Sequence, residues 1–184
     1  MDSTPFYIFL FLHLSCLILG FGSVLVTDLY GLLWIRDHIR FARVVKLSGV
    51  TEKFVWAGWI GMVAAGIPLI VIKGEIDNLM AIKLFFVALV GANGVPLHYL
   101  HKALERFEGS DSPPNILLFR TTLGISVSQL AWWGAIAIGF LHRHVQTIID
   151  WPPMPWLVSG AILAGILLIW AMGEAVFKVK KAAD

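Results

Sequence analysis

A histidine lies inside the first long apolar stretch of this sequence. His13 belongs to the 21-residue run Phe6–Val26, which contains no acidic residue, no lysine and no arginine. At a rise of about 1.5 Å per residue, a helix of that length crosses the roughly 30 Å hydrocarbon core of a bilayer. An ionisable side chain is costly in lipid, so we expect His13 to face protein or a bound group. An imidazole in that position could ligate a metal or transfer a proton.

A glycine shares the face of this run that carries His13. Gly20 follows His13 by seven residues, and at about 100° per residue the two lie on one stripe of a helix. An imidazole can be an axial ligand of haem iron, and a glycine would let the flat macrocycle lie against the backbone. Trp132, in a later apolar run, could cover the porphyrin. We therefore expect b-type haem with His13 as the metal ligand and with Gly20 and Trp132 as cofactor contacts.

Other ionisable residues also fall within apolar runs. Lys83 lies at the predicted depth of His13 and could neutralise a haem propionate, ligate the iron, or extend to the lipid headgroups. Asp28 and His98 lie toward the opposite membrane surface, where they could act as catalytic groups in a proton relay. The alternatives are that Asp28 pairs with nearby basic residues and that His98 is interfacial. Glu174 has the same alternative as Asp28.

A resemblance to a known family rests on the order of these residues. His13 in a first span, a glycine-containing continuation, and Lys83 opening a later span followed by a histidine resemble the small bacterial membrane proteins that include the copper-resistance D type and the haem-binding membrane protoporphyrinogen oxidase. The resemblance extends over roughly Phe6–Leu104. It implies a helical bundle with b-type haem and carries over to His13 and Lys83.

Composition and hydropathy define the elements that must position these residues. The chain is 58% hydrophobic and 14% charged, whereas a soluble domain is about a quarter charged. We expect an all-α polytopic membrane bundle that forms a single domain over residues 1–184. Its five predicted spans cover residues 6–35, 54–72, 79–100, 119–141 and 156–177. One cysteine, Cys16, excludes an internal disulfide and any metal site built from thiolates alone.

The basic residues predict an orientation. Of the 14 lysines and arginines, 11 fall on one side: in the segment between spans one and two, around the segment between spans three and four, and in the tail. By the positive-inside rule, the amino terminus is expected outside and the carboxyl terminus in the cytoplasm.

Small and helix-breaking residues predict local features. Ala57, Gly61 and Ala65 recur every fourth residue and predict a face that another helix can approach closely. The stretch Gly91–Pro96 contains two glycines, an asparagine and a proline, and is expected to be bent or locally unwound. Residues 39–46 could form an interfacial amphipathic helix or simply a basic anchor. His142, His144 and Asp150 suggest a metal site only weakly.

Three functions are compatible with this pattern. The leading hypothesis is a haem- or porphyrin-binding redox protein that transfers electrons between a quinone-like or porphyrin substrate and a partner, which would make it a membrane oxidoreductase. The second is a proton- or ion-coupled transporter or small channel. The third is a non-catalytic membrane subunit that packs against other chains or against copies of itself. All three place a multi-pass protein in a bacterial inner membrane, in contact with lipid and not with nucleic acid.

Overall fold

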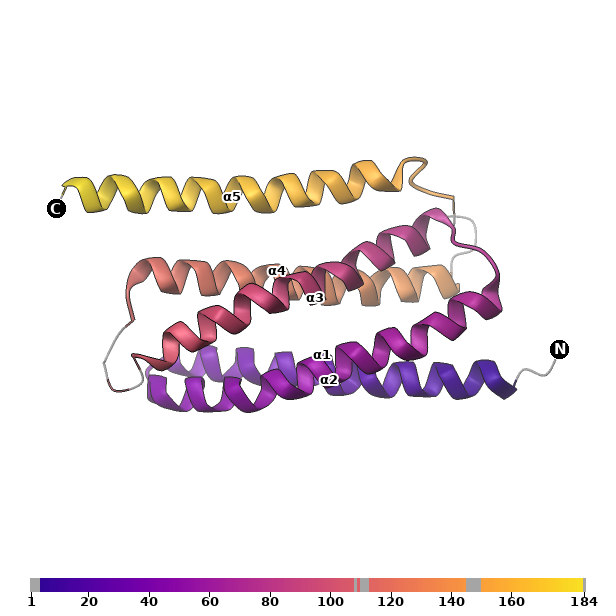
Figure 1. The fold of residues 1–184 in the computed structure, drawn as a ribbon, viewed down its shortest axis with the longest axis horizontal. Coiled ribbons are helices and arrows are strands. Elements are labelled where there is room, and N and C mark those ends of the chain that lie inside the picture. The colour runs from indigo at the N-terminus through magenta and orange to yellow at the C-terminus, as the bar shows by residue number, and fades with distance from the viewer. Residues whose placement is uncertain (1–3, 108, 110–112, 145–149, 184) are drawn as a thin grey trace. The chain divides into compact units, whose positions relative to one another are not determined.

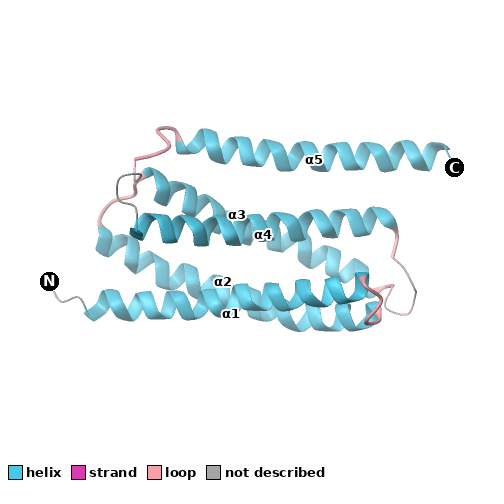
Figure 2. Cartoon of the chain, turned by 180° about the vertical axis from the view of Figure 1, so that it is seen from behind, coloured by secondary structure: helices cyan, strands magenta, loops and turns pink. Residues whose placement is uncertain are grey.

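Five long helices make up the described part of the chain. The computed structural model describes residues 4–107, 109, 113–144 and 150–183, and of residues 143, 144 and 181–183 only the backbone. The helices are α1 (Thr4–Ile35), α2 (Phe41–Lys73), α3 (Asn78–Glu105), α4 (Asn115–His144) and α5 (Pro155–Ala183) (Figure 1). Among these residues there is no strand (Figure 2). All five helices are long and apolar enough to cross a membrane, which confirms the predicted all-α polytopic class.

The second helix begins well before its predicted start. α2 starts at Phe41 rather than near residue 54, so it includes most of the segment for which an interfacial helix was one prediction. Phe41 and Val45 are only 7% and 4% exposed, so the first turns of α2 are packed rather than lying on a lipid surface. The predicted span started only after the charged residues that precede it. A helix can nevertheless extend beyond the hydrocarbon, with its charged side chains in the headgroup region.

The chain divides into two compact units. The first contains residues 1–76 and 101–112, and the second contains residues 77–100 and 113–184. The last turn of α3 therefore belongs with α1 and α2, and the rest of α3 belongs with α4 and α5.

In the first unit, α1 and α2 run antiparallel with their backbones in close approach (Figure 1). A Cβ atom placed on Gly58 would lie 2.5 Å from the Cα of Gly20, and one placed on Gly61 would lie 2.6 Å from the Sγ of Cys16. Ala65 is also buried on this side of α2. The predicted small-residue packing face is therefore confirmed at Gly61 and Ala65, but Ala57 is exposed and Gly58 makes the closest contact in its place.

A tight turn joins these two helices. The N–H of His38 donates to the carbonyl of Leu33, and the N–H of Asp37 donates to the carbonyl of Trp34. Asp37 has a φ of 58°, in the left-handed region. Together these features form a Schellman motif, which satisfies carbonyl groups left open at the end of α1.

In the second unit, α3 and α4 also pack antiparallel across glycines. A Cβ on Gly134 would lie 2.7 Å from the ring of Phe86, and one on Gly124 would lie 2.6 Å from Cδ2 of Leu97. The side-chain amide of Asn93 donates to the carbonyl of Gly124 at 2.8 Å.

The prediction of local unwinding in the third span is wrong. α3 is helical from Asn78 to Glu105, with Pro96 inside it. A proline removes one backbone donor, and neighbouring helices can stabilise the surrounding backbone. Contacts such as that of Asn93 with α4 hold this part of α3 in place.

The last helix is held mainly near one end. Arg120 of α4 donates two hydrogen bonds to the carboxylate of Glu174 in α5, at 2.6 and 2.8 Å. Next to this pair, the ring of Phe119 lies against Gly173 and 5.7 Å from the ring of Phe177. No residue of the most apolar stretch of α5 is buried. Most of this helix is therefore available to lipid.

Candidate functional site

His13 faces the neighbouring helix of its own unit. Its Nδ1 lies 2.8 Å from the backbone carbonyl oxygen of Met62 in α2. A Cβ atom on Gly66 would lie 3.4 Å from both Nδ1 and Cε1 of the ring, so the imidazole rests directly on the backbone of α2. The side chain is half-buried. The expectation that this histidine faces protein is therefore confirmed.

This hydrogen bond fixes the chemistry of the ring. A carbonyl oxygen can only accept, so Nδ1 of His13 must carry the proton and donate it. In the neutral imidazole, Nε2 then holds the lone pair with which a histidine binds a metal. Metal-ligating histidines commonly donate their other ring N–H to a backbone carbonyl, which fixes the orientation of the ring. The geometry at Nδ1 is thus the one required of an Nε2 ligand.

The other expected cofactor contacts in the apolar runs are covered by protein. Gly20 is buried, and its backbone lies against Gly58 of α2, so α2 occupies the surface on which a macrocycle was expected to lie. The side chain of Trp132 is 0% exposed, whereas the adjacent Trp133 is 54% exposed. Of these residues, only His13 has a geometry that fits a haem ligand, and Gly20 fits helix packing instead.

Lys83 lies in the second unit, against α4. A Cβ atom on Gly139 would lie 3.4 Å from Nζ of Lys83 and 3.6 Å from its Cε. The amine therefore extends along the surface of α4 at a glycine, and the side chain is half-buried. His13 belongs to the first unit and Lys83 to the second.

The two proposed catalytic residues also belong to different units. Asp28, in the first unit, is half-buried and follows Thr27, a residue at the contact of α1 with α2. His98, in the second, is half-buried and meets the ring of Tyr99 edge-on, with centroids 5.7 Å apart. Their predicted partnership as a proton relay stays a prediction.

A set of polar contacts in the first unit had not been predicted. The hydroxyls of Thr27 and Thr51 lie 2.6 Å apart across the contact of α1 with α2. One turn earlier in α2, the hydroxyl of Ser48 lies 3.1 Å from Nδ1 of His101, whose Nε2 lies 3.4 Å from the carboxylate of Glu105. The spacing of His101 and Glu105 suits an i, i+4 pair, but nothing local in the sequence indicates Ser48.

A second unpredicted contact joins α3 and α4 at the end of the second unit. Nε2 of His142 lies 2.5 Å from Oδ2 of Asp77, and the other oxygen of this carboxylate accepts the N–H of Met80 at 2.8 Å. Asp77 therefore caps α3 and binds α4 at once. The cap could have been recognised in the sequence because Asp77 directly precedes an apolar run.

The weak metal-site prediction finds no support in the described residues. The side chain of His144 lies outside them, and the side-chain amide of Asn78 donates to the backbone carbonyl of Asp150 at 2.9 Å. Within the described ranges, no three histidine, cysteine or acidic side chains are grouped so as to hold a metal ion.

The alternative given for Glu174, that it pairs with a basic residue, is confirmed by its two hydrogen bonds to Arg120.

Comparisons of the chain with models of known families, with curated proteins and with solved structures gave no match. What the chain can do is therefore inferred from its own residues.

Proposed function

We propose that this chain is an integral membrane redox protein that binds b-type haem through Nε2 of His13. The protein would transfer electrons between a quinone-like or porphyrin substrate and a partner in a bacterial inner membrane. Its amino terminus would lie outside and its carboxyl terminus in the cytoplasm, as the distribution of lysines and arginines favours.

One observation carries the proposal. The 2.8 Å contact between Nδ1 of His13 and the carbonyl of Met62 makes Nδ1 the donor and gives the lone pair to Nε2. Met62 is only 3% exposed, and Gly66 supports the ring on the same side, so α2 holds the imidazole in one orientation. A ligand held in this way pays little entropy for binding a metal.

Haem would supply one-electron transfer, and the protein would supply ligation and an apolar surrounding. Donation from His13 to a backbone carbonyl makes the imidazole a stronger electron donor through Nε2. Lys83 carries its amine on a long flexible stem against α4 of the second unit, and its role at a haem propionate stays a prediction from the sequence. Asp28 and His98 remain candidates for moving protons when the substrate gains or loses them.

The transport alternative gains no support from Glu174. A proton- or ion-coupled transporter would use Asp28, Lys83, His98 and Glu174 along its path. Glu174, however, forms two hydrogen bonds with the guanidinium of Arg120, and this fork geometry favours a structural link between α4 and α5.

The test is the visible absorption spectrum of the protein purified from cells supplied with haem. We expect a Soret band in the wild type and its loss in His13→Ala. Added imidazole should restore the band in His13→Gly, because free imidazole can replace the missing ligand but not a lost fold.

His101→Ala is the matched control. His101 is also a half-buried histidine of the first unit whose Nδ1 contacts a group of α2, in this case the hydroxyl of Ser48. It should retain the Soret band. A colourless wild type, or a His13→Ala protein with an unchanged spectrum, would contradict the proposal. A colourless protein with ion flux that depends on Asp28 would favour the transporter, and a chain recovered only with a partner would favour the subunit hypothesis.

A further inference from the structure

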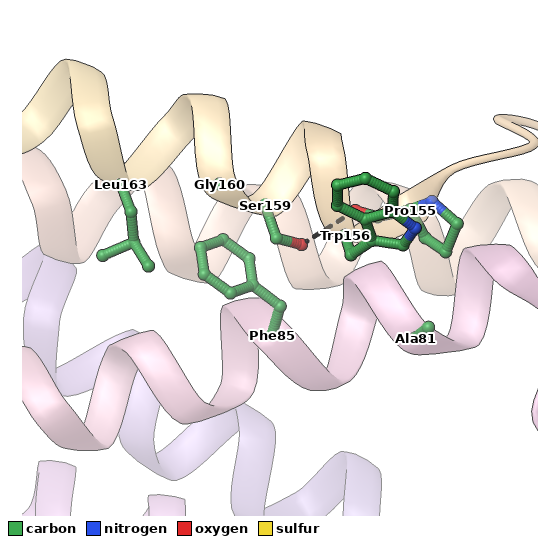
Figure 3. Close-up of a pocket in the computed structure, with 7 residues that line it drawn as sticks. All are labelled: Ala81, Phe85, Pro155, Trp156, Ser159, Gly160 and Leu163. Atoms are coloured by element: carbon green, nitrogen blue, oxygen red, sulfur yellow. Dashed lines mark hydrogen bonds between the residues drawn. The ribbon is translucent and has the colours of Figure 1, made fainter.

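An apolar groove runs between α3 and α5 in the second unit. Its volume is about 440 Å³, within the range of small-molecule sites. Figure 3 shows Phe85 of α3 and Leu163 of α5 pointing toward one another across it. It is lined by Ala81, Phe85, Pro155, Trp156, Ser159, Gly160 and Leu163.

The residues that line the groove have few polar groups with which water could form hydrogen bonds. Ser159 is the only lining residue with a hydroxyl, and this group donates to the carbonyl of Pro155 at 3.1 Å, as the dashed line in Figure 3 marks. A trapped water needs two to four polar partners, and apolar cavities without them stay dry. Since α3 and α5 are both long and apolar enough to span a membrane, the groove would be filled from the bilayer rather than from solvent.

The groove is short and narrow. Along α5 it extends from Pro155 to Leu163, which is about 12 Å at the rise of a helix. A whole helix with its side chains is about 10 Å or more across. A hydrocarbon chain is narrow enough to enter.

The groove also begins where a lipid chain would begin. Pro155 is the first residue of α5, and Ala81 lies in the first turn of α3, so the groove starts at the ends of two membrane-spanning helices. Trp156 stands at this end and is 66% exposed. Tryptophan is enriched at the depth of lipid headgroups, where its ring is in apolar surroundings and its N–H can donate to polar groups.

We propose that this groove is a lipid-binding site that holds one acyl chain of a membrane phospholipid, with the lipid headgroup beside Trp156. The site is independent of the haem proposed for the first unit. The acyl chain lies along α5 between the side chains of Phe85 and Leu163, and it fills the space between Gly160 and α3.

Two glycines of α5 make a matched test. A Cβ atom on Gly160, which lines the groove, meets nothing within 4 Å, and the same is true of Gly165, which does not line it. Gly160→Phe therefore places a ring at the groove from a position where its Cβ meets no obstacle, and Gly165→Phe adds the same ring to the same helix elsewhere. Displacing about two methylene groups weakens binding by roughly tenfold.

The experiment uses the full-length protein in vesicles of phosphatidylcholine that carry a photoactivatable diazirine on one acyl chain. After illumination, labelled residues are located by mass spectrometry. We expect more label on Phe85 and Ser159 than on Leu167 and Leu168, two exposed residues farther along α5. The label on Phe85 should fall about tenfold in Gly160→Phe and stay unchanged in Gly165→Phe.

Two results would overturn the proposal. One is equal labelling of the groove and of Leu167 and Leu168 in the wild type, since ordinary surrounding lipid would label all exposed residues alike. The other is a Gly160→Phe protein that keeps the label on Phe85 but changes from dimer to monomer in cross-linking, which would make the groove a contact between copies of this chain. Neither result depends on whether the protein binds haem.

Discussion

The contact of α1 with α2 and the contact of α4 with α5 join membrane helices in different ways. In the first, Gly58 meets the backbone of Gly20, so the main chains of the two helices touch. In the second, Gly173 meets the ring of Phe119, and the adjacent Arg120 pairs with Glu174. The first contact extends along both helices, whereas most of α5 remains exposed.

The difference shows what a glycine contributes to a membrane contact. Between membrane helices, close packing replaces the hydrophobic driving force that water provides elsewhere. Where a glycine faces another main chain, nothing can move aside for a larger residue. Where it faces the end of a side chain, a rotation can make room. The two contacts should therefore respond differently to the same substitution.

The largest effect should come from Gly58→Ala. The new methyl group would lie 2.5 Å from Cα of Gly20, and a helix backbone cannot give way without separating α1 from α2. We expect the free energy of unfolding to fall by about 3 kcal/mol or more, measured by titration with SDS in mixed micelles.

Gly22→Ala is the control for this prediction. It lies on α1 near Gly20, and a Cβ there meets nothing within 4 Å. The alanine should leave stability unchanged or raise it by about 0.5–1 kcal/mol. If both variants unfold alike, the backbone contact of Gly58 does not stabilise the protein.

A smaller effect should come from Gly173→Ala, although its new methyl group would overlap the ring of Phe119 even more closely. The ring is the far end of a side chain and can turn, so we expect a loss of about 1 kcal/mol. The double variant Gly173→Ala, Phe119→Ala should remove the clash. The difference between its loss of unfolding free energy and the sum of the two single losses measures the clash. A Gly173→Ala loss larger than that of Gly58→Ala would contradict the distinction between backbone and side-chain obstacles.

The smallest effect should come from Thr51→Val, which removes the 2.6 Å contact with Thr27 but preserves the shape of the side chain. The hydroxyl of Thr27 still donates to the carbonyl of Ser23, so the substitution leaves it with a hydrogen-bond partner. The expected loss is about 0.6 kcal/mol, the typical value for a hydrogen bond between membrane helices. A loss as large as that of Gly58→Ala would mean that hydrogen bonding, and not close packing, holds α1 to α2.

Much of the fold could be predicted because it depends on local composition. Long apolar runs identify the five spans, and the small residues Gly61 and Ala65 identify a packing face, although Gly58 and not the exposed Ala57 completes it. The start of α2 was missed because hydropathy reports where the hydrocarbon ends and not where the helix ends. The contact of His142 with Asp77 was missed because 65 residues separate them.

The candidate site was only partly predictable for a similar reason. The apolar run around His13 shows that the ring needs a partner, and the structure provides the carbonyl of Met62. Every residue has such a carbonyl, so no residue type in the sequence could have identified it. The position of Gly20 on the same helix face as His13 was equally ambiguous, because a glycine there can accommodate either a flat macrocycle or a neighbouring helix.

The Schellman turn at Asp37 affects how the protein is made. With only residues 36–40 between them, α1 and α2 precede α3–α5 along the chain and can pair as a helical hairpin as soon as both have left the ribosome. Chains generally fold from the amino terminus during synthesis, and contacts between nearby segments form fastest. The hairpin can therefore enter the membrane and close on itself while translation continues, and His13 receives its partner from Met62 at that stage.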